Sequence, residues 1–269
     1  MSEEPRLSPS IAHKLNQYPL AGWAAHRLLG NFRRASTSSN VDGSLWHAAV
    51  MGGTNEVEVI DCDSFRTKDA KAARDHALAE GKLPVTAAKW ANYELGSARI
   101  RRSLEDIGIE FGGIVEERIE WAETTEAGQT VDCSGYIDHR DGLNIIDLKT
   151  DPAMTPDAAA RSIVNSHALL QEPAYRSAIS SLLDVDLERV TMTYVFVQVE
   201  EPFAVFPVQM SGEFRELAHL KWRRAIETWA KCLARGKSRE FWPGPASQIQ
   251  TVHAPQWMVN QEMEREEIR

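Results

Sequence analysis

The segment 133–150 constrains the fold more than any other part of the chain, because a turn signal joins two strand-like stretches. Asp141-Gly142 is a strong signal for a two-residue β-hairpin loop, since a type I′ turn needs positive φ at both central positions. In the stretch that follows, Ile146 and Leu148 share one face. We therefore expect an antiparallel hairpin with an apolar face that anchors it to the core.

The other face of this hairpin carries charge. Side chains alternate along a strand, so Asp147 and Lys149 share a face, and a loop at Asp141-Gly142 places Asp138 on that face, opposite Ile145. A one-residue shift in register would place Asp138 on the other face. Two carboxylates on backbones roughly 7–8 Å apart can close around one divalent cation, and a neighbouring lysine can hold a water. Asp-x-Lys alone is more typical of an exposed face with an ordinary salt bridge.

The rest of the chain predicts an α/β fold: a mixed central β-sheet flanked by helices, with an N-terminal helical arm. Strand-like patterns cover 57–60, 114–121, 131–138, 143–149, 190–199 and 203–208. Helical patterns cover 8–29, 43–50, 67–81, 86–108, 155–183, with a break near Pro173, and 213–233. We expect one domain over 1–269, with a helical region at 1–110, a core at 111–235 and a tail at 236–269.

Composition excludes several classes of protein. The 269 residues include 30 Lys+Arg and 39 Asp+Glu, and the net charge of −9 counts against a general electrostatic binder of nucleic acid or membrane, although a local basic groove stays possible. Cys62, Cys133 and Cys232 are far apart, which argues against a disulfide framework or a structural zinc; we expect them reduced and buried. Without a run of about 20 apolar residues or a signal peptide, we expect a cytoplasmic protein that does not engage a membrane.

Several short motifs occur in a recognisable order. Gly135-x-Ile137-Asp138, followed by Asp147-Leu148-Lys149, resembles the core of the PD-(D/E)XK nuclease superfamily. An upstream histidine, a glutamate before the core strands and a downstream Gln-x-x-x-Tyr resemble the branch that includes the nuclease domains of bacterial recombination helicase–nucleases; these are His47, Glu117, Gln171 and Tyr175. The two ends of the chain resemble phage and prophage exonucleases of the exonuclease VIII type.

The resemblance implies a chemistry and a set of roles. It implies hydrolysis of a phosphodiester with Mg²⁺ or Mn²⁺, in a restriction-endonuclease-like core. By resemblance, Lys149 orients the water, and the metal ligands are Asp138, Asp147, the Leu148 carbonyl, Glu117 and His47. Glu116 competes with Glu117 for the upstream acid, because the two face opposite ways along a strand.

Further residues are expected to meet DNA. Gln171 and Tyr175 are four apart and share a helical face directed at DNA or at the lysine. The alternative is a buried tyrosine with a hydrogen-bonded glutamine. Arg66 and Lys68 are candidate phosphate contacts, with 99–102 as a competing basic cluster, and either cluster can instead be a solvated face.

We therefore predict a metal-dependent exonuclease acting on the ends of linear double-stranded DNA, from 5′ to 3′, in phage-type recombination. The resemblance also implies a homo-oligomeric ring and a single-strand annealing protein as partner, in the cytoplasm of a bacterial or phage-infected cell. One alternative is an endonuclease or a nuclease subunit of a repair or defence complex. Another is a catalytically inactive protein that binds DNA ends.

Overall fold

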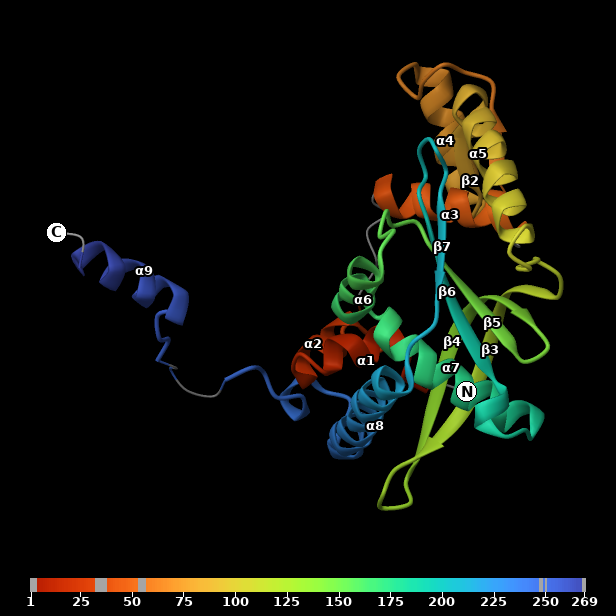
Figure 1. Ribbon diagram of the computed structural model, residues 1–269. Coiled ribbons are helices and arrows are strands. Elements are labelled where there is room, and N and C mark those ends of the chain that lie inside the picture. Colours follow the sequence, from red (N-terminus) through yellow and green to blue (C-terminus); the bar gives the residue numbers. More distant parts are fainter. Residues whose placement is uncertain (1–3, 32–37, 53–56, 247–248, 250, 268–269) are drawn as a thin grey trace.

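The computed structural model describes residues 4–31, 38–52, 57–246, 249 and 251–267. Its centre is a five-stranded sheet with the order β3-β4-β5-β6-β7 (Figure 1). The strands are β3 (Ile114–Thr124), β4 (Thr130–Asp141), β5 (Asn144–Lys149), β6 (Thr191–Val197) and β7 (Val205–Val208). β5 and β6 run parallel, and the other neighbouring strands run antiparallel. The prediction of a mixed sheet flanked by helices is confirmed.

The parallel pair β5–β6 needs a crossover connection, which two helices supply. These are α6 (Pro156–Asn165) and α7 (Ala168–Leu183), followed by the 3₁₀ turn η1 (Leu187–Arg189). The predicted break near Pro173 is wrong: the helices separate at Ser166-His167, and Pro173 lies inside α7. Most of α7 is buried, so its packing offsets the backbone hydrogen bond that Pro173 cannot donate.

Helices α1 (Pro9–Leu15), α2 (Pro19–Ala25), α7 and α8 (Gly212–Arg235) form the layer on one side of the sheet (Figure 1). Trp222 and Trp229 of α8 are each 1% exposed at the centre of this core. The first helices, predicted as a helical arm, pack against the sheet, because Leu7 bridges to Cys133 of β4 and Leu15 is buried in the same core. Burial of these leucines ties the N-terminal segment to the sheet.

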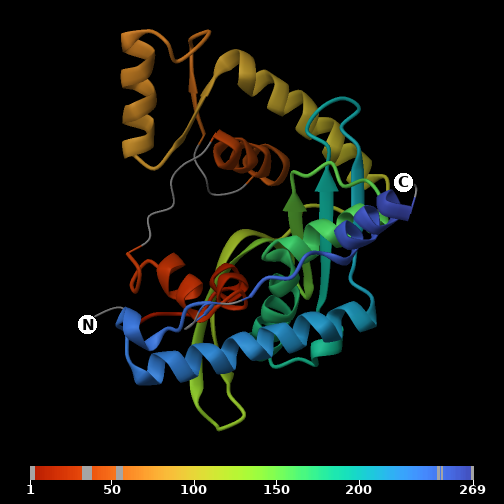
Figure 2. The same ribbon diagram turned by 90° about the vertical axis from the view of Figure 1, so that its left-hand side faces the viewer.

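A second core lies on the other side of the sheet. It contains residues of α3 (Ser38–Met51) and α5 (Ala87–Glu105) packed with Ile146 and Leu148 of β5, which confirms the anchoring role of these two residues. Next to it, β1 (Val57–Ile60) and β2 (Leu83–Thr86) form a parallel pair joined by α4 (Lys68–Ala79). Figure 2 shows these elements gathered at one end of the molecule. The strand β2 was missed, because a four-residue run containing Pro84 gives little strand signal.

The hairpin forms with a different loop from the predicted one. Arg140 pairs with Ile145 and Asp141 with Asn144, so the loop is Gly142-Leu143. Gly142 has a φ of 56° whereas Leu143 does not have a positive φ, so the turn is not type I′. The register differs from the prediction by two residues, which preserves the alternation of faces.

The tail continues from α8 through η2 (Arg239–Phe241) to α9 (Gln256–Glu267). α9 lies apart from the sheet and its covering helices (Figure 1). Cys133 and Cys232 are buried and free as predicted, but Cys62, in the loop after β1, is only half-buried. Across the described ranges, no helix combines the length and apolar character needed to cross a bilayer.

Candidate active site

A cavity of about 480 Å³, here called the site cavity, is lined by elements from distant parts of the sequence. β5 contributes Asp147, Leu148 and Lys149 to its wall. The other lining residues come from β3, β4, α3, the loop after β5 and the α6–α7 region. Six residues predicted for the site line it: His47, Asp138, Asp147, Leu148, Lys149 and Gln171. The fold therefore brings together groups that are more than 120 positions apart in the chain, from 47 to 171.

The two aspartates lie on neighbouring strands at the wall of this cavity. Asp138 Oδ2 accepts a hydrogen bond from the backbone N–H of Leu148 at 3.1 Å, which fixes its carboxylate against β5. Asp147 has a side chain that is only 2% exposed. Burial, and then the negative charge of Asp147, raise the pKa of Asp138 well above its usual range. The cavity thus concentrates negative charge that a cation would stabilise.

Lys149 and Gln171 connect to Asp147 in a closed set of contacts. Lys149 Nζ lies 2.5 Å from Asp147 Oδ2, and it donates to Gln171 Oε1 at 3.0 Å. Gln171 Nε2 donates to Asp147 Oδ1 at 2.8 Å. Gln171 therefore holds the carboxylate and the ammonium at once, from the first turn of α7. Its contact with Lys149 agrees with the prediction that Gln171 is directed at DNA or at the lysine, whereas its hydrogen bond to Asp147 was not predicted.

His47 reaches the cavity from α3. Its Nδ1 lies 3.5 Å from Asp138 Oδ2. Burial lowers the pKa of His47, although the charge of Asp147 and hydrogen bonding with the Leu148 backbone act in the opposite direction. A neutral imidazole is the form that can accept a proton or bind a metal. The predicted location of His47 beside the aspartates agrees with the structure.

The upstream acid of the cavity is Glu116, and Glu117 is placed elsewhere. Glu117 makes a two-contact ion pair with Arg140, with Arg140 Nε to Glu117 Oε2 at 2.5 Å and Nη2 to Oε1 at 2.7 Å. Glu116 lines the site cavity, with a φ of 50° that few non-glycine residues adopt. The charge of Glu116 also contributes to the raised pKa of Asp138. This corrects the choice of Glu117, because the carboxylate of Glu117 is paired with Arg140 whereas Glu116 lines the cavity.

Tyr175 does not reach toward DNA. Its side chain is 5% exposed and packs edge-on against Trp121, with ring centroids 6.4 Å apart. A Cβ built on Gly135 would lie 2.5 Å from Tyr175 Cε1, so the glycine leaves room for this ring. The alternative of a buried tyrosine is therefore correct for Tyr175, whereas Gln171 reaches the lysine as the first interpretation predicted. The motif residues Gly135 and Tyr175 are in contact across the core.

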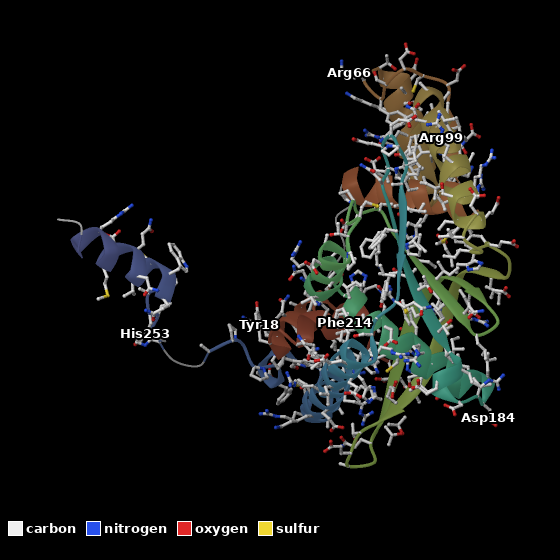
Figure 3. The ribbon with its side chains drawn as sticks, in the orientation of Figure 1. Tyr18, Arg66, Arg99, Asp184, Phe214 and His253 are labelled. Carbon is white, nitrogen blue, oxygen red and sulfur yellow. The ribbon has the colours of Figure 1, made fainter. Side chains whose placement is uncertain are left out.

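The predicted phosphate contacts lie outside the site cavity. Arg66 and Lys68 are both exposed, just before and at the start of α4. Figure 3 shows Arg66 at the end of the molecule that α4 and α5 form, with Arg99 at the same end. Arg99 of the competing cluster makes an ion pair with Glu201. Neither cluster is brought next to the aspartates.

Several residues of the site cavity were not identified from the sequence. Asp151 follows the strand that carries Lys149, and its Oδ2 accepts a hydrogen bond from Ser162 Oγ at 2.6 Å. His167 joins the wall at the break between α6 and α7. Proximity to the Asp-x-Lys strand was a signal for Asp151, but nothing in the local pattern around His167 pointed to the site.

The donor set suits a hard divalent cation. Within the described residues, no group of three or more His, Cys, Asp or Glu side chains is arranged to hold a metal. Mg²⁺ does not need such a cage, since it is held by one or two carboxylates together with waters and substrate phosphates. Asp138 and Asp147 supply two carboxylates beside the Leu148 backbone, in a cavity with excess negative charge. The residues therefore fit Mg²⁺ or Mn²⁺ better than a structural zinc.

The sheet and its helical layers define the class of protein as mixed α/β, and comparison with known proteins supports this at the level of the fold. A crystal structure from Eubacterium rectale, provisionally named an exonuclease, aligns over 94% of this chain and 92% of its own, with a TM-score of 0.53 and 11% identity. The protein SSO0001 aligns over 72% of this chain and 86% of its own, at 10% identity and a TM-score of 0.28. No family model and no curated protein matches the chain.

Proposed function

We propose that this protein is a divalent-metal-dependent deoxyribonuclease that hydrolyses phosphodiester bonds at the ends of linear double-stranded DNA. The observation that carries the proposal is the convergence of Asp138, Asp147 and Lys149 on one cavity, with His47 and Gln171 beside them. Two buried carboxylates this close repel each other, and Lys149 offsets the charge of one of them, so a cation bound in this cavity would be stabilised. The fold shared with the provisionally named exonuclease supports the same reaction class.

Each residue has a defined part in this proposal. Asp138, Asp147 and the backbone carbonyl of Leu148 would hold the cation, and Glu116 would act beside them. A bound divalent cation stabilises the charge that develops on the phosphate oxygens and lowers the pKa of a coordinated water. Lys149 would orient the attacking water, while Gln171 keeps its ammonium in place through the 3.0 Å hydrogen bond. His47 would contact the same water or the phosphate.

The experiment compares three substrates: linear DNA with 5′-phosphates, linear DNA without them, and covalently closed DNA. We expect both Mg²⁺ and Mn²⁺ to support hydrolysis of the linear forms, and a chelator to abolish it. Asp147→Ala should lower the rate of hydrolysis by at least about 100-fold, because it removes a carboxylate that would hold the cation. Asp106→Ala, which removes an exposed carboxylate at the end of α5, is the matched control and should retain full activity.

The outcomes separate the proposal from its alternatives. Cleavage of closed circles would identify an endonuclease, or a nuclease subunit of a larger complex, instead of an exonuclease. Unchanged DNA after prolonged incubation with both metals would favour the inactive end-binding protein. Full activity in Asp147→Ala would refute the site. The 5′ to 3′ direction, the ring-shaped homo-oligomer and the annealing partner remain parts of the proposal that rest on the sequence resemblance.

A further inference from the structure

Helix α9 carries apolar side chains that no other part of the described chain covers. Figure 1 shows the helix apart from the sheet and the helices around it. Trp257 is 68% exposed, Met263 is 59% exposed and Met258 is 48% exposed. Isolated helices shorter than about 12–15 residues are marginal in water, and packing of an apolar face is what normally stabilises them. The 12 residues of α9 are therefore expected to pack on a surface that buries this apolar side.

The apolar side of α9 is hollowed, and negative charge follows it along the helix. A cavity of about 300 Å³ is lined by Ala254, Met258, Val259, Glu262 and Met263. A hollow lined by such side chains accommodates an aliphatic side chain from a neighbouring helix. The second half of the helix reads Glu-Met-Glu-Arg-Glu-Glu and is net acidic. Along its length, α9 thus changes from apolar to acidic.

The outward face of α8 shows the matching order. Leu217 is 53% exposed and Leu220 is 61% exposed, although both are large apolar side chains. Exposed cations follow on the same helical face, at Arg224, Lys231 and Arg235. Among the residues that the structure describes, none forms an ion pair with these three cations. Along its length, α8 thus changes from apolar to basic.

The two faces match when the helices lie parallel. The leucines of α8 then meet the hollow of α9, and the acidic half of α9 lies beside the cations of α8. The spacing agrees, because Arg224 lies seven residues after Leu217 and the middle of the acidic half lies about seven residues after Met258. At the rise of an α-helix, both separations are about 10 Å. An antiparallel alignment would instead place the acidic half near Glu213 and Glu216, which are exposed at the start of α8.

Within one copy of the chain, both faces stay exposed. The segment after α8 is anchored where Trp242 packs against Trp229, with ring centroids 5.3 Å apart. The next anchor is the Pro243 carbonyl, which accepts a hydrogen bond from the Leu20 N–H at 3.0 Å. Beyond these contacts the tail leads away from α8 (Figure 1), so α9 does not cover the leucines of its own chain. A helix and a complementary face that are both uncovered in one copy can cover each other between two copies.

We propose that α9 of one copy packs parallel to α8 of a second copy. Leu217 and Leu220 contact the apolar side of α9, and its acidic half lies beside Arg224 and Lys231. The contact joins two different surfaces, so each copy offers one surface to each of two neighbours or both surfaces to the same neighbour. The ring named above rests on sequence resemblance, whereas this contact rests on the exposed faces of α8 and α9. It does not depend on the proposed nuclease activity.

Sedimentation equilibrium of the whole chain measures this contact, and the native chain should self-associate. The double variant Leu217→Ser/Leu220→Ser changes α8, and Met258→Ser/Met263→Ser changes α9. Each should weaken self-association at least about 10-fold, because apolar contacts at the centre of an interface are lost. All four side chains are exposed in a single copy, so both variants should keep a cooperative thermal unfolding transition.

Leu182→Ser/Leu183→Ser is the matched control, because it removes two exposed leucines at the end of α7. This variant should self-associate as strongly as the native chain. Arg224→Glu should weaken self-association, and raised salt should weaken it in the native chain, because the acidic half of α9 is attracted to the cations of α8. An equal loss in the leucine control would show association through apolar surface in general and would overturn the inference.

Mixing the α8 double variant with the α9 double variant tests which surfaces pair. Each variant alone keeps one intact surface and should be monomeric. The mixture should form a complex of one copy of each, because the intact α9 of the first fits the intact α8 of the second. An α8 variant that self-associates alone would show that α9 pairs with itself or with another face, and a mixture that stays monomeric would show that the two faces do not meet; either result overturns the inference.

DNA hydrolysis by the same native sample separates this inference from the proposed function. A native chain that self-associates through α8 and α9 but hydrolyses no DNA would overturn the proposed function and support the inference. A native chain that stays monomeric at every concentration but hydrolyses linear DNA would overturn the inference alone.

Discussion

Gly135→Ala should destabilise the protein through a single contact with the side chain of Tyr175. The added Cβ would lie 2.5 Å from Cε1, 3.2 Å from Cζ and 3.1 Å from the hydroxyl oxygen of that ring. The ring cannot move away freely, because it is 5% exposed and packed against Trp121. Overpacking of this kind costs about 1–3 kcal/mol in free energy of unfolding. For a chain near this length, that corresponds to a fall in Tm of roughly 2–12 °C.

Thermal unfolding followed by circular dichroism measures this loss, with Gly212→Ala as the matched control. Gly212 begins α8 and an added Cβ there meets nothing within 4 Å, so its Tm should stay the same or rise slightly. In a Tyr175→Leu background the clashing atoms are gone, and Gly135→Ala should then cost much less. An unchanged Tm in Gly135→Ala, or an equal loss in both backgrounds, would refute the reasoning. Hydrolysis should also fall, because Gln171 lies one turn before Tyr175 on α7.

Two further predictions concern the acids of the site. Glu116→Gln should lower the rate of DNA hydrolysis roughly 10- to 100-fold with little change in Tm. Glu117→Gln should retain activity and lose about 1–3 kcal/mol in free energy of unfolding, because Arg140 loses its partner. The reverse pattern in rate and melting assays would make Glu117 the acid of the site. The raised pKa of Asp138 means that protons compete with the metal for this carboxylate, so Mg²⁺ affinity should fall as pH decreases, and binding should release protons. Calorimetry in two buffers of different ionisation enthalpy counts these protons, and a count of zero would contradict the prediction.

Local pattern determined much of the fold from sequence. Strand alternation placed Ile146 and Leu148 on the face that is buried in the second core, and the turn residues gave the hairpin to within two positions of register. The loop position was wrong because Asp141-Gly142 and Gly142-Leu143 are both compatible with a glycine in the loop. Only the cross-strand pairing, which depends on packing of both strands, distinguishes them.

The candidate site was predictable as a set of residues but not as an arrangement. The motifs identified Asp138, Asp147 and Lys149, since their types and spacing are local. The sequence also directed Gln171 at DNA or at Lys149, but its second hydrogen bond, to Asp147, depends on how α7 packs across the sheet. The missed strand β2 has the same origin, since it forms by pairing with β1 and by contacts with α3 and α5.

The sequence by itself determined the α/β class, the charged hairpin face and the identity of its acids, because alternation and turn chemistry act over a few neighbouring residues. Tertiary structure decided which of two adjacent glutamates enters the cavity, through the left-handed backbone at Glu116 and the Arg140 partner of Glu117. It also decided that Tyr175 is a core residue, through its contact with Gly135. These choices depend on contacts between segments far apart in the chain, which no local pattern encodes.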